Sequence, residues 1–219
     1  MRSDAGGCTS CAGQEQELPI AMSRVRADDY DEKKRLILER AAALFAAKGF
    51  GNATMIDIAQ ACGASKSRLY HYFGSKEEVL FGIAMEYVEA VYETLVEATA
   101  QPLPAAARFA RFVAAFLERG VSSRNEQLVL VNDVDFLPED KRRQVRTMEN
   151  RLVELLIGLL EEINPGLMGL GRVRVPYAML LFGMLIWTFT WYEKDGEISP
   201  EELAARISRL FLHGFEKAE

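Results

Sequence analysis

The sequence predicts an all-α protein of about nine helices, with a three-helix N-terminal helix-turn-helix unit and a larger C-terminal helical body. Apolar residues recur at helical spacing through most of the chain, and no segment shows the alternating pattern of a half-buried strand. Glycine and proline residues separate the periodic segments. The composition, 49% hydrophobic and 26% charged, is that of a globular protein with a core.

Residues 1–29 are predicted to be a disordered extension, because Gly, Ser, Gln and Glu dominate residues 1–21 and leave little to bury. The same stretch lacks the apolar core of a signal peptide. Cys8 and Cys11 form a CxxC without a second pair, which is more often incidental than a zinc or redox site. Met22 remains an alternative start of the chain.

Residues 30–74 are predicted to form a small helical domain. Its first helix ends at Gly49. Thr54 followed by Asp57 is a capping-box pattern that begins a second, short helix, and Ser65 caps a third. The last two helices and the short turn between them have the spacing of a helix-turn-helix. The three predicted helices cover residues 31–48, 54–62 and 65–72.

Residues 75–219 are predicted to form a second, larger helical domain. Ser75 with Glu78 is another capping-box pattern, which begins a long helix, and Ser199 with Glu202 is a third. The expected helices of this domain run about 75–99, 104–119, 124–134, 138–163, 173–193 and 199–216.

The segment Val175–Tyr192 has two interpretations, because it carries no charged residue and reaches the lower length limit of a membrane span. Pro176, Thr188 and Thr190 favour a helix buried in a bundle, which can also be apolar all round. We therefore expect a buried helix and no membrane contact, with a membrane span as the alternative.

The charge and residue counts exclude several classes of protein. The 219 residues carry a net charge of −6, so any contact with nucleic acid requires a local basic patch. Residues 22–74 provide one, since basic residues outnumber acidic ones there, whereas residues 75–219 are acidic. Three cysteines are too few for a disulfide scaffold and predict a reducing, cytoplasmic compartment. Two histidines disfavour a histidine-rich metal centre.

The second helix of the helix-turn-helix is predicted to enter the major groove of DNA. Lys66 and Arg68 offer cations for phosphate or guanine, whereas Leu69 and Phe73 are expected to point inward. Thr54 opens a helix whose free N–H groups can bind phosphate. The candidate DNA-binding residues are Thr54, Ser65, Lys66, Ser67, Arg68, Tyr70, His71, Tyr72 and Lys76.

Residues 33–81 resemble the DNA-binding domain of the TetR family of bacterial repressors. The residues that carry the resemblance are Ala42, Leu44–Phe45, Gly49–Phe50, Thr54, Ile58–Ala59, Gly63, Ser65–Lys66, Leu69–Phe73, Ser75–Glu78 and Leu80. The resemblance implies a homodimer that reads palindromic operator DNA and is released by a small-molecule effector. It also implies that the last two helices form the dimer interface. Arg68 departs from the family pattern, which more often has a small or hydroxyl side chain there, and a guanine contact would use it.

The same resemblance implies an effector cavity within residues 75–219. Its candidate lining residues are bulky and mostly apolar, as ligand cavities usually are. They are Phe109, Phe112, Phe116, Met148, Arg151, Leu152, Tyr177, Phe182, Met184, Trp187 and Trp191. Ordinary core packing is the alternative for each of them.

A second, narrower resemblance concerns the effector itself. Residues 187–199 are similar to a segment of TetR-type regulators of acyl-CoA catabolism, and Asn132–Asp133 with Leu137–Pro138 resembles regulators of phenylacetate breakdown. The resemblance implies a CoA thioester such as phenylacetyl-CoA, whose phosphates would need cations. The available cations are Arg108, Arg111, Lys141, Arg142, Arg143, Arg146 and Arg151. The alternatives are another hydrophobic ligand, such as a drug or a lipid, and no small molecule.

Neither an enzyme nor a cofactor is expected, because the sequence lacks GxSxG, P-loop and HExxH patterns and a GxGxxG after a strand. Asp133, Asp135, Glu139 and Asp140 form an acidic cluster of a kind that can bind a metal. Helix capping at Pro138 explains part of this cluster, so we expect no metal site.

Overall fold

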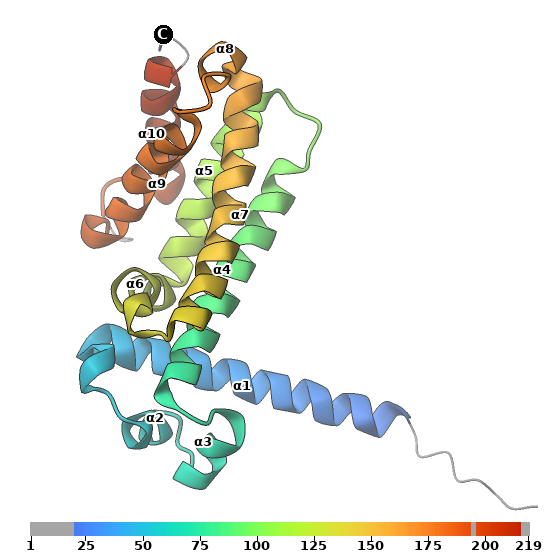
Figure 1. Ribbon diagram of the computed structural model, residues 1–219, viewed down its shortest axis with the longest axis vertical. Coiled ribbons are helices and arrows are strands. Elements are labelled where there is room, and N and C mark those ends of the chain that lie inside the picture. The colour runs from blue at the N-terminus through green and yellow to red at the C-terminus, as the bar shows by residue number, and fades with distance from the viewer. Residues whose placement is uncertain (1–19, 194–195, 216–219) are drawn as a thin grey trace, which may run out of the picture. The chain divides into compact units, whose positions relative to one another are not determined.

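The computed structural model describes residues 20–193 and 196–215, and its elements are helical throughout these ranges (Figure 1). The all-α prediction is therefore confirmed. The chain divides into two compact units, Met1–Arg35 and Leu36–Glu219. Residues 1–19, including Cys8 and Cys11, lie outside the described residues.

Helix α1, Ile20–Lys48, begins earlier than the expected start at Asp31. The later part of the extension expected over residues 1–29 is therefore helical. Neither glycine nor proline occurs between Ile20 and Lys48, and the stretch contains good helix formers such as Ala, Met and Arg. Nothing in the chain interrupts the helix before Gly49, where φ is +80°.

The two short helices of the helix-turn-helix form as predicted. They are α2, Met55–Ala61, and α3, Lys66–Tyr72. Gly63 lies in the turn between them with a φ of +60°, in the left-handed region that favours glycine. A 3-10 turn, η1, covers Phe50–Asn52 and leads into this motif.

The predicted number of helices is also confirmed, since nine helices of seven residues or more lie within the described ranges. Those of the body are α4 (Lys76–Thr99), α5 (Ala105–Ser122), α6 (Arg124–Asp133), α7 (Glu139–Ile163), α9 (Arg174–Trp191) and α10 (Pro200–Phe215). Two short elements were not expected: the 3-10 turn η2, Val134–Phe136, and the single-turn helix α8, Pro165–Met168. The expected helix stop at Asn164 is present, but its side chain also caps α8 by accepting from the Leu167 N–H at 3.0 Å.

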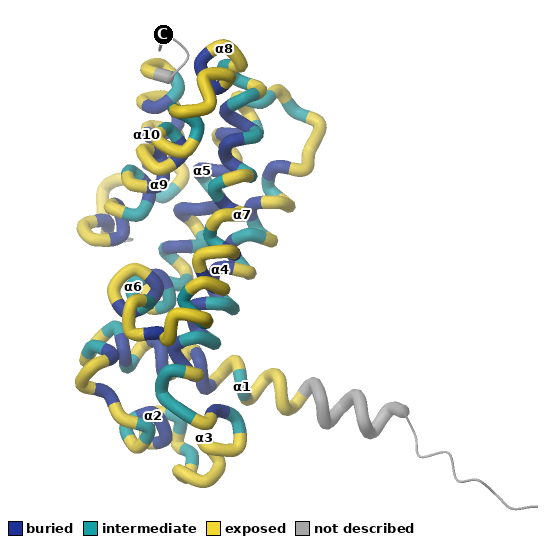
Figure 2. Tube along the Cα trace, viewed as in Figure 1, coloured by how far each residue is buried: buried dark blue, intermediate teal, exposed yellow. Residues whose placement is uncertain are grey.

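Helices α4, α5 and α7 pack against one another and bury the core of the body between them (Figures 1 and 2). Phe112 of α5 and Leu156 of α7 are both 0% exposed. Helix α10 packs along α5, where the rings of Phe109 and Phe211 stack with centroids 5.6 Å apart. Helix α9 packs on α5 and α7.

Helix α9 is buried on one side and exposed on the other in the single chain. Leu181 and Leu185 are fully buried, whereas Leu180 and Trp187 are 62% and 67% exposed. No helix in the described part of the chain is long and apolar enough to cross a membrane. The exposed side chains of Leu180 and Trp187 give α9 an apolar outer face in the single chain.

Candidate nucleic-acid interface and ligand cavity

Helix α3 presents a polar surface and is anchored by two buried apolar side chains. The Ser65 hydroxyl accepts a hydrogen bond from the Arg68 N–H at 3.2 Å and fixes the start of the helix. Leu69 is 0% exposed and Phe73, which follows α3, is 4% exposed, so the prediction that both point inward is confirmed. The Lys66 ammonium lies 5.7 Å from the centroid of the Tyr70 ring on the same helix.

Most of the candidate DNA-binding residues lie on this exposed surface. The exposed ones are Thr54, Ser65, Lys66, Ser67, Arg68, Tyr70 and His71. Tyr72 is half-buried and packs against the core. Lys66 and Arg68 form no ion pair within the part of the chain that the structure describes. A capped helix with exposed cations and hydroxyls is suited to contact phosphates and base edges.

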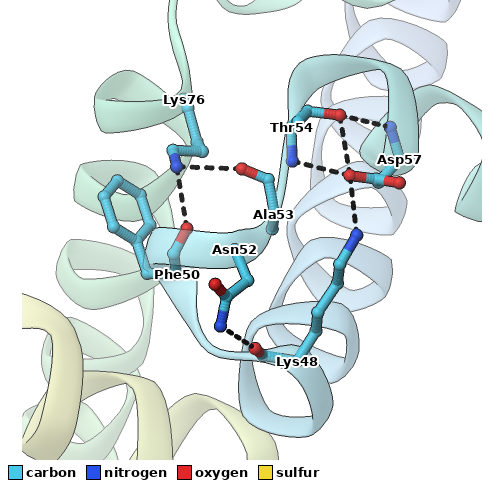
Figure 3. Close-up of polar contacts among 7 residues, drawn as sticks. All are labelled: Lys48, Phe50, Asn52, Ala53, Thr54, Asp57 and Lys76. Atoms are coloured by element: carbon cyan, nitrogen blue, oxygen red, sulfur yellow. Dashed lines mark hydrogen bonds and ion pairs between the residues drawn. The ribbon is translucent and has the colours of Figure 1, made fainter.

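Thr54 and Asp57 build the predicted capping box at the start of α2 (Figure 3). The Thr54 N–H donates to Asp57 Oδ2 at 2.8 Å, and the Asp57 N–H donates to Thr54 Oγ1 at 3.2 Å. The Thr54 hydroxyl and the Lys48 ammonium also donate to Asp57 Oδ2, at 2.7 and 3.0 Å. These contacts, led by that of the Thr54 hydroxyl, lower the pKa of Asp57 to about 2.

Lys76, one of the predicted DNA-binding residues, makes contacts within the protein. Its ammonium donates to the carbonyl oxygens of Phe50 and Ala53 at 2.7 and 2.9 Å (Figure 3). It also lies 4.2 Å from the centroid of the Phe50 ring. The side chain is half-buried and connects the start of α4 to η1, and its contact with DNA stays a prediction.

Asp133, at the end of α6, makes a second connection between the body and η1. It is 8% exposed and lies near the backbone of Phe50. Burial raises the pKa of this carboxyl, whereas the nearby Phe50 backbone and the charge of Lys76 act against that rise. The Phe136 ring in η2 also lies 5.2 Å from the Phe50 ring. Across the described ranges, no three His, Cys, Asp or Glu side chains group in a way that could hold a metal.

A cavity of about 210 Å³ lies between α4, α5, α6, α7 and α9. Its apolar wall consists of Val88, Val91, Phe116, Leu130, Leu152, Val153, Met179, Phe182 and Ile186. Its polar residues are Tyr87, Gln127, Glu149 and Asn150. The buried Tyr87 hydroxyl donates to Gln127 Oε1 at 2.5 Å, and burial raises the pKa of Tyr87. An apolar cavity with a few polar groups is typical of small-molecule sites.

The predicted effector-binding residues are distributed over several places. Phe116, Leu152 and Phe182 lie in the cavity wall. Phe109 and Phe112 are buried in the core beside it, and Tyr177 and Met184 are partly buried against that core. Met148 and Arg151 line a separate hollow between α4 and α7, where Arg151 lies 4.1 Å from the Tyr92 ring centroid. Trp187 and Trp191 lie on the exposed side of α9.

Several of the cations considered for CoA phosphates already have acidic partners. Arg108 contacts Glu162, and Arg142 contacts Glu139. Arg146 lies 3.7 Å from Asp135. Arg111 and Arg143 are exposed. Lys141 lies 4.0 Å from Glu78 and 5.4 Å from the Phe81 ring centroid.

Sequence reasoning missed the polar part of the cavity. Tyr87, Val88 and Val91 share one side of α4, a pattern that indicates burial but does not distinguish a cavity wall from packed core. Gln127 follows three polar or charged residues of α6, so no signal in the sequence indicated that its amide would be buried.

These features define a helix-turn-helix DNA-binding regulator with a helical body that contains a cavity. The family of this regulator follows from sequence comparison. Residues 37–83 match the model of bacterial regulatory proteins of the tetR family, and residues 102–215 match the model of the tetracyclin repressor-like C-terminal domain. The chain belongs to the TetR family of transcriptional repressors.

Individual relatives agree with this assignment. A TetR-family transcriptional regulator from Bordetella parapertussis 12822 is 37% identical, with a TM-score of 0.79 over 85% of this chain and 97% of the other. The HTH-type transcriptional repressor KstR2 of Mycobacterium tuberculosis is 27% identical over 90% of this chain and 98% of its own length. AibR, solved with isovaleryl coenzyme A and operator DNA, is 23% identical with a TM-score of 0.70 over 81% and 97% of the two chains.

Proposed function

We propose that this repressor binds palindromic operator DNA as a homodimer and is released by an acyl-CoA thioester, such as phenylacetyl-CoA. Residues 30–74 would act as the DNA-binding domain and residues 75–219 as the effector-binding and dimerisation domain. The observation that carries the proposal is the connection between two features of the chain. Helix α3 is capped and exposes polar side chains, and helix α4, which follows the helix-turn-helix, also lines the cavity. AibR, which shares the fold, was solved with a CoA thioester and DNA.

The connections to η1 support a path from the cavity to the DNA-binding surface. Lys76 of α4 donates to the carbonyl oxygen of Phe50, and Asp133 of α6 lies near the Phe50 backbone. The same two helices contribute Tyr87 and Gln127 to the cavity. An effector that favours another arrangement of α4 and α6 would therefore move the helix-turn-helix, and its differential affinity for the two arrangements sets the size of the effect.

The DNA-binding half of the proposal can be tested with single substitutions on α3. Lys66→Ala and Tyr70→Ala should each weaken operator binding roughly tenfold or more, because each removes a contact to phosphate or base. The measurement is a titration of a duplex selected by the wild-type protein from a random pool. Arg143→Ala, an exposed cation of α7, is the control and should leave affinity unchanged. Unchanged affinity in both α3 variants would show that α3 does not read the groove.

The effector half can be tested by thermal unfolding with a panel of acyl-CoA thioesters, steroids, lipids and drugs. A ligand that binds the folded state raises the melting temperature. We expect stabilisation by an acyl-CoA and release of the operator at the same concentration. If only ligands of another class stabilise the protein, that class and not the CoA thioesters contains the effector. If no ligand of the panel stabilises it, a repressor without a small-molecule effector is favoured.

A further inference from the structure

The amide of Gln127 is only partly satisfied inside the cavity. The residue is 3% exposed, and its Oε1 accepts the hydrogen bond of the Tyr87 hydroxyl. Its Nε2 has no acceptor among the residues that the structure describes. This N–H is not among the buried side-chain atoms that lack a partner, so it keeps some accessible surface and can donate to an occupant of the cavity that carries an acceptor.

Glu149 places a carboxyl group in the same cavity wall. It is half-buried on α7 and forms no ion pair within the described ranges. Burial raises the pKa of this carboxyl, and the charge of Arg146 partly opposes that rise. A second carboxylate in the cavity would lose its hydration and meet the charge of Glu149. An uncharged carbonyl oxygen would avoid the repulsion and a large part of the desolvation cost.

The size of the cavity limits which part of an effector it can enclose. Its volume of about 210 Å³ suits a hydrocarbon chain or a single ring, whereas cavities that hold whole drug-sized molecules run from about 300 to 1,000 Å³. Val91, Phe116 and Phe182 supply an apolar wall for the hydrocarbon. The nucleotide of a CoA thioester would therefore remain outside this cavity.

We propose that the cavity recognises the acyl group and carbonyl of a thioester, with the Gln127 amide donating to the carbonyl oxygen and Glu149 excluding the free acid. The inference rests on the proposed function, because it names the part of the effector that this cavity reads. The repressor then responds to a carboxylic acid only after a thioester-forming reaction has activated it, although both forms carry the same hydrocarbon.

The wild-type protein tests this inference without any substitution. Octanoyl-CoA, its thioether analogue S-octyl-CoA, which lacks the carbonyl, and octanoate would be titrated by calorimetry, with phenylacetyl-CoA and phenylacetate as a second pair. We expect the thioester to bind about tenfold more tightly than the thioether, as the gain of one hydrogen bond implies. We expect no measurable binding of either free acid. Equal affinities for thioester and thioether would overturn the role of Gln127.

Two variants isolate the Gln127 amide. Tyr87→Phe removes the hydroxyl but keeps the amide, so the preference for the thioester should persist. The double variant Tyr87→Phe/Gln127→Met removes the amide and leaves no Tyr87 hydroxyl without its acceptor. Its preference for the thioester over the thioether should fall to about twofold or less. A preference that survives in the double variant would contradict the inference.

Glu149 has its own matched pair of variants. Glu149→Gln removes the negative charge from the cavity wall and should allow octanoate to bind. Glu154→Gln makes the same change at an exposed position of α7 and should not. Continued exclusion of octanoate by Glu149→Gln would overturn the role of Glu149.

Operator binding, measured on the same preparations, separates this inference from the proposed function. If acyl-CoAs release the operator but S-octyl-CoA does so equally well, the inference alone fails. If none of the compounds binds while operator binding persists, the CoA-thioester effector fails, and the inference fails with it.

Discussion

At the scale of single residues, the helix-turn-helix depends on side chains that bind backbone groups which the helix ends leave unpaired. The Thr54 hydroxyl, the Asp57 carboxylate and the Ser65 hydroxyl serve the N-termini of α2 and α3. Lys76 serves the carbonyls of Phe50 and Ala53. The residue types that can bind a phosphate therefore also stabilise the helix-turn-helix from within. Only the position of each side chain in the structure tells which of these two roles it has.

The low pKa of Asp57 predicts a specific response of stability to pH. The folded-state pKa of about 2 lies below the ordinary value of 3.8, so ionised Asp57 stabilises the fold above about pH 4. This contribution disappears as the pH falls toward about 2. Asp57→Asn should therefore lower the melting temperature near pH 6, and the difference from wild type should shrink in acid. Thermal unfolding followed by circular dichroism at a series of pH values measures it.

A matched control separates this effect from general acid destabilisation. Glu39→Gln neutralises an exposed carboxylate of α1 that has no ion-pair partner in the described part of the molecule. It should leave the melting temperature nearly unchanged across the series. A constant difference between wild type and Asp57→Asn from neutral to acid pH would show that the carboxylate contacts do not stabilise the fold.

At the scale of elements, capping patterns and helix breakers located helix ends, whereas residue types alone did not show which contacts a side chain makes. Thr54 and Asp57 located the start of α2, because a capping box is a local contact that nearby residues determine. The internal role of Lys76 depends on carbonyls that precede it by more than twenty residues, so spacing could not reveal it. The placement of Trp187 outside the cavity wall depends on which side of α9 faces α5, which only packing decides.

The packing of α9 against α5 depends on a glycine. A Cβ on Gly120 would lie 2.0 Å from Cζ of Phe189, so Gly120→Ala requires the ring to move. Overpacking of this kind should cost about 1–3 kcal/mol in the free energy of unfolding. Gly158→Ala on α7 is the matched control, since its Cβ meets nothing within 4 Å, and it should gain roughly 0.5–1 kcal/mol in helix propensity. Denaturant unfolding of both variants provides the comparison, and equal stabilities would exclude a tight α5–α9 contact.

At the scale of the whole molecule, the outer side of α9 is the feature that a single chain does not explain. Val175, Leu180, Trp187 and Trp191 are all more than half exposed. Monomeric proteins rarely expose so many large apolar side chains on one helix, so a second copy of the chain is the proposed cover. A symmetric partner would present the same side chains, as a two-fold interface requires. Two copies would also present two α3 helices to a palindromic site.

The dimer proposal predicts that one charge on this side separates the subunits. Trp187→Arg would bury a cation in an apolar interface without a partner, so we expect light scattering to give the mass of a single chain at micromolar concentration. Operator affinity should fall by orders of magnitude, because each half-site would then be bound independently. Val131→Arg places the same charge on α6, at a side chain that is 52% exposed, and should leave both properties unchanged. If the Trp187→Arg protein stays dimeric, the interface lies elsewhere. If it becomes monomeric and keeps full operator affinity, operator binding does not require two subunits.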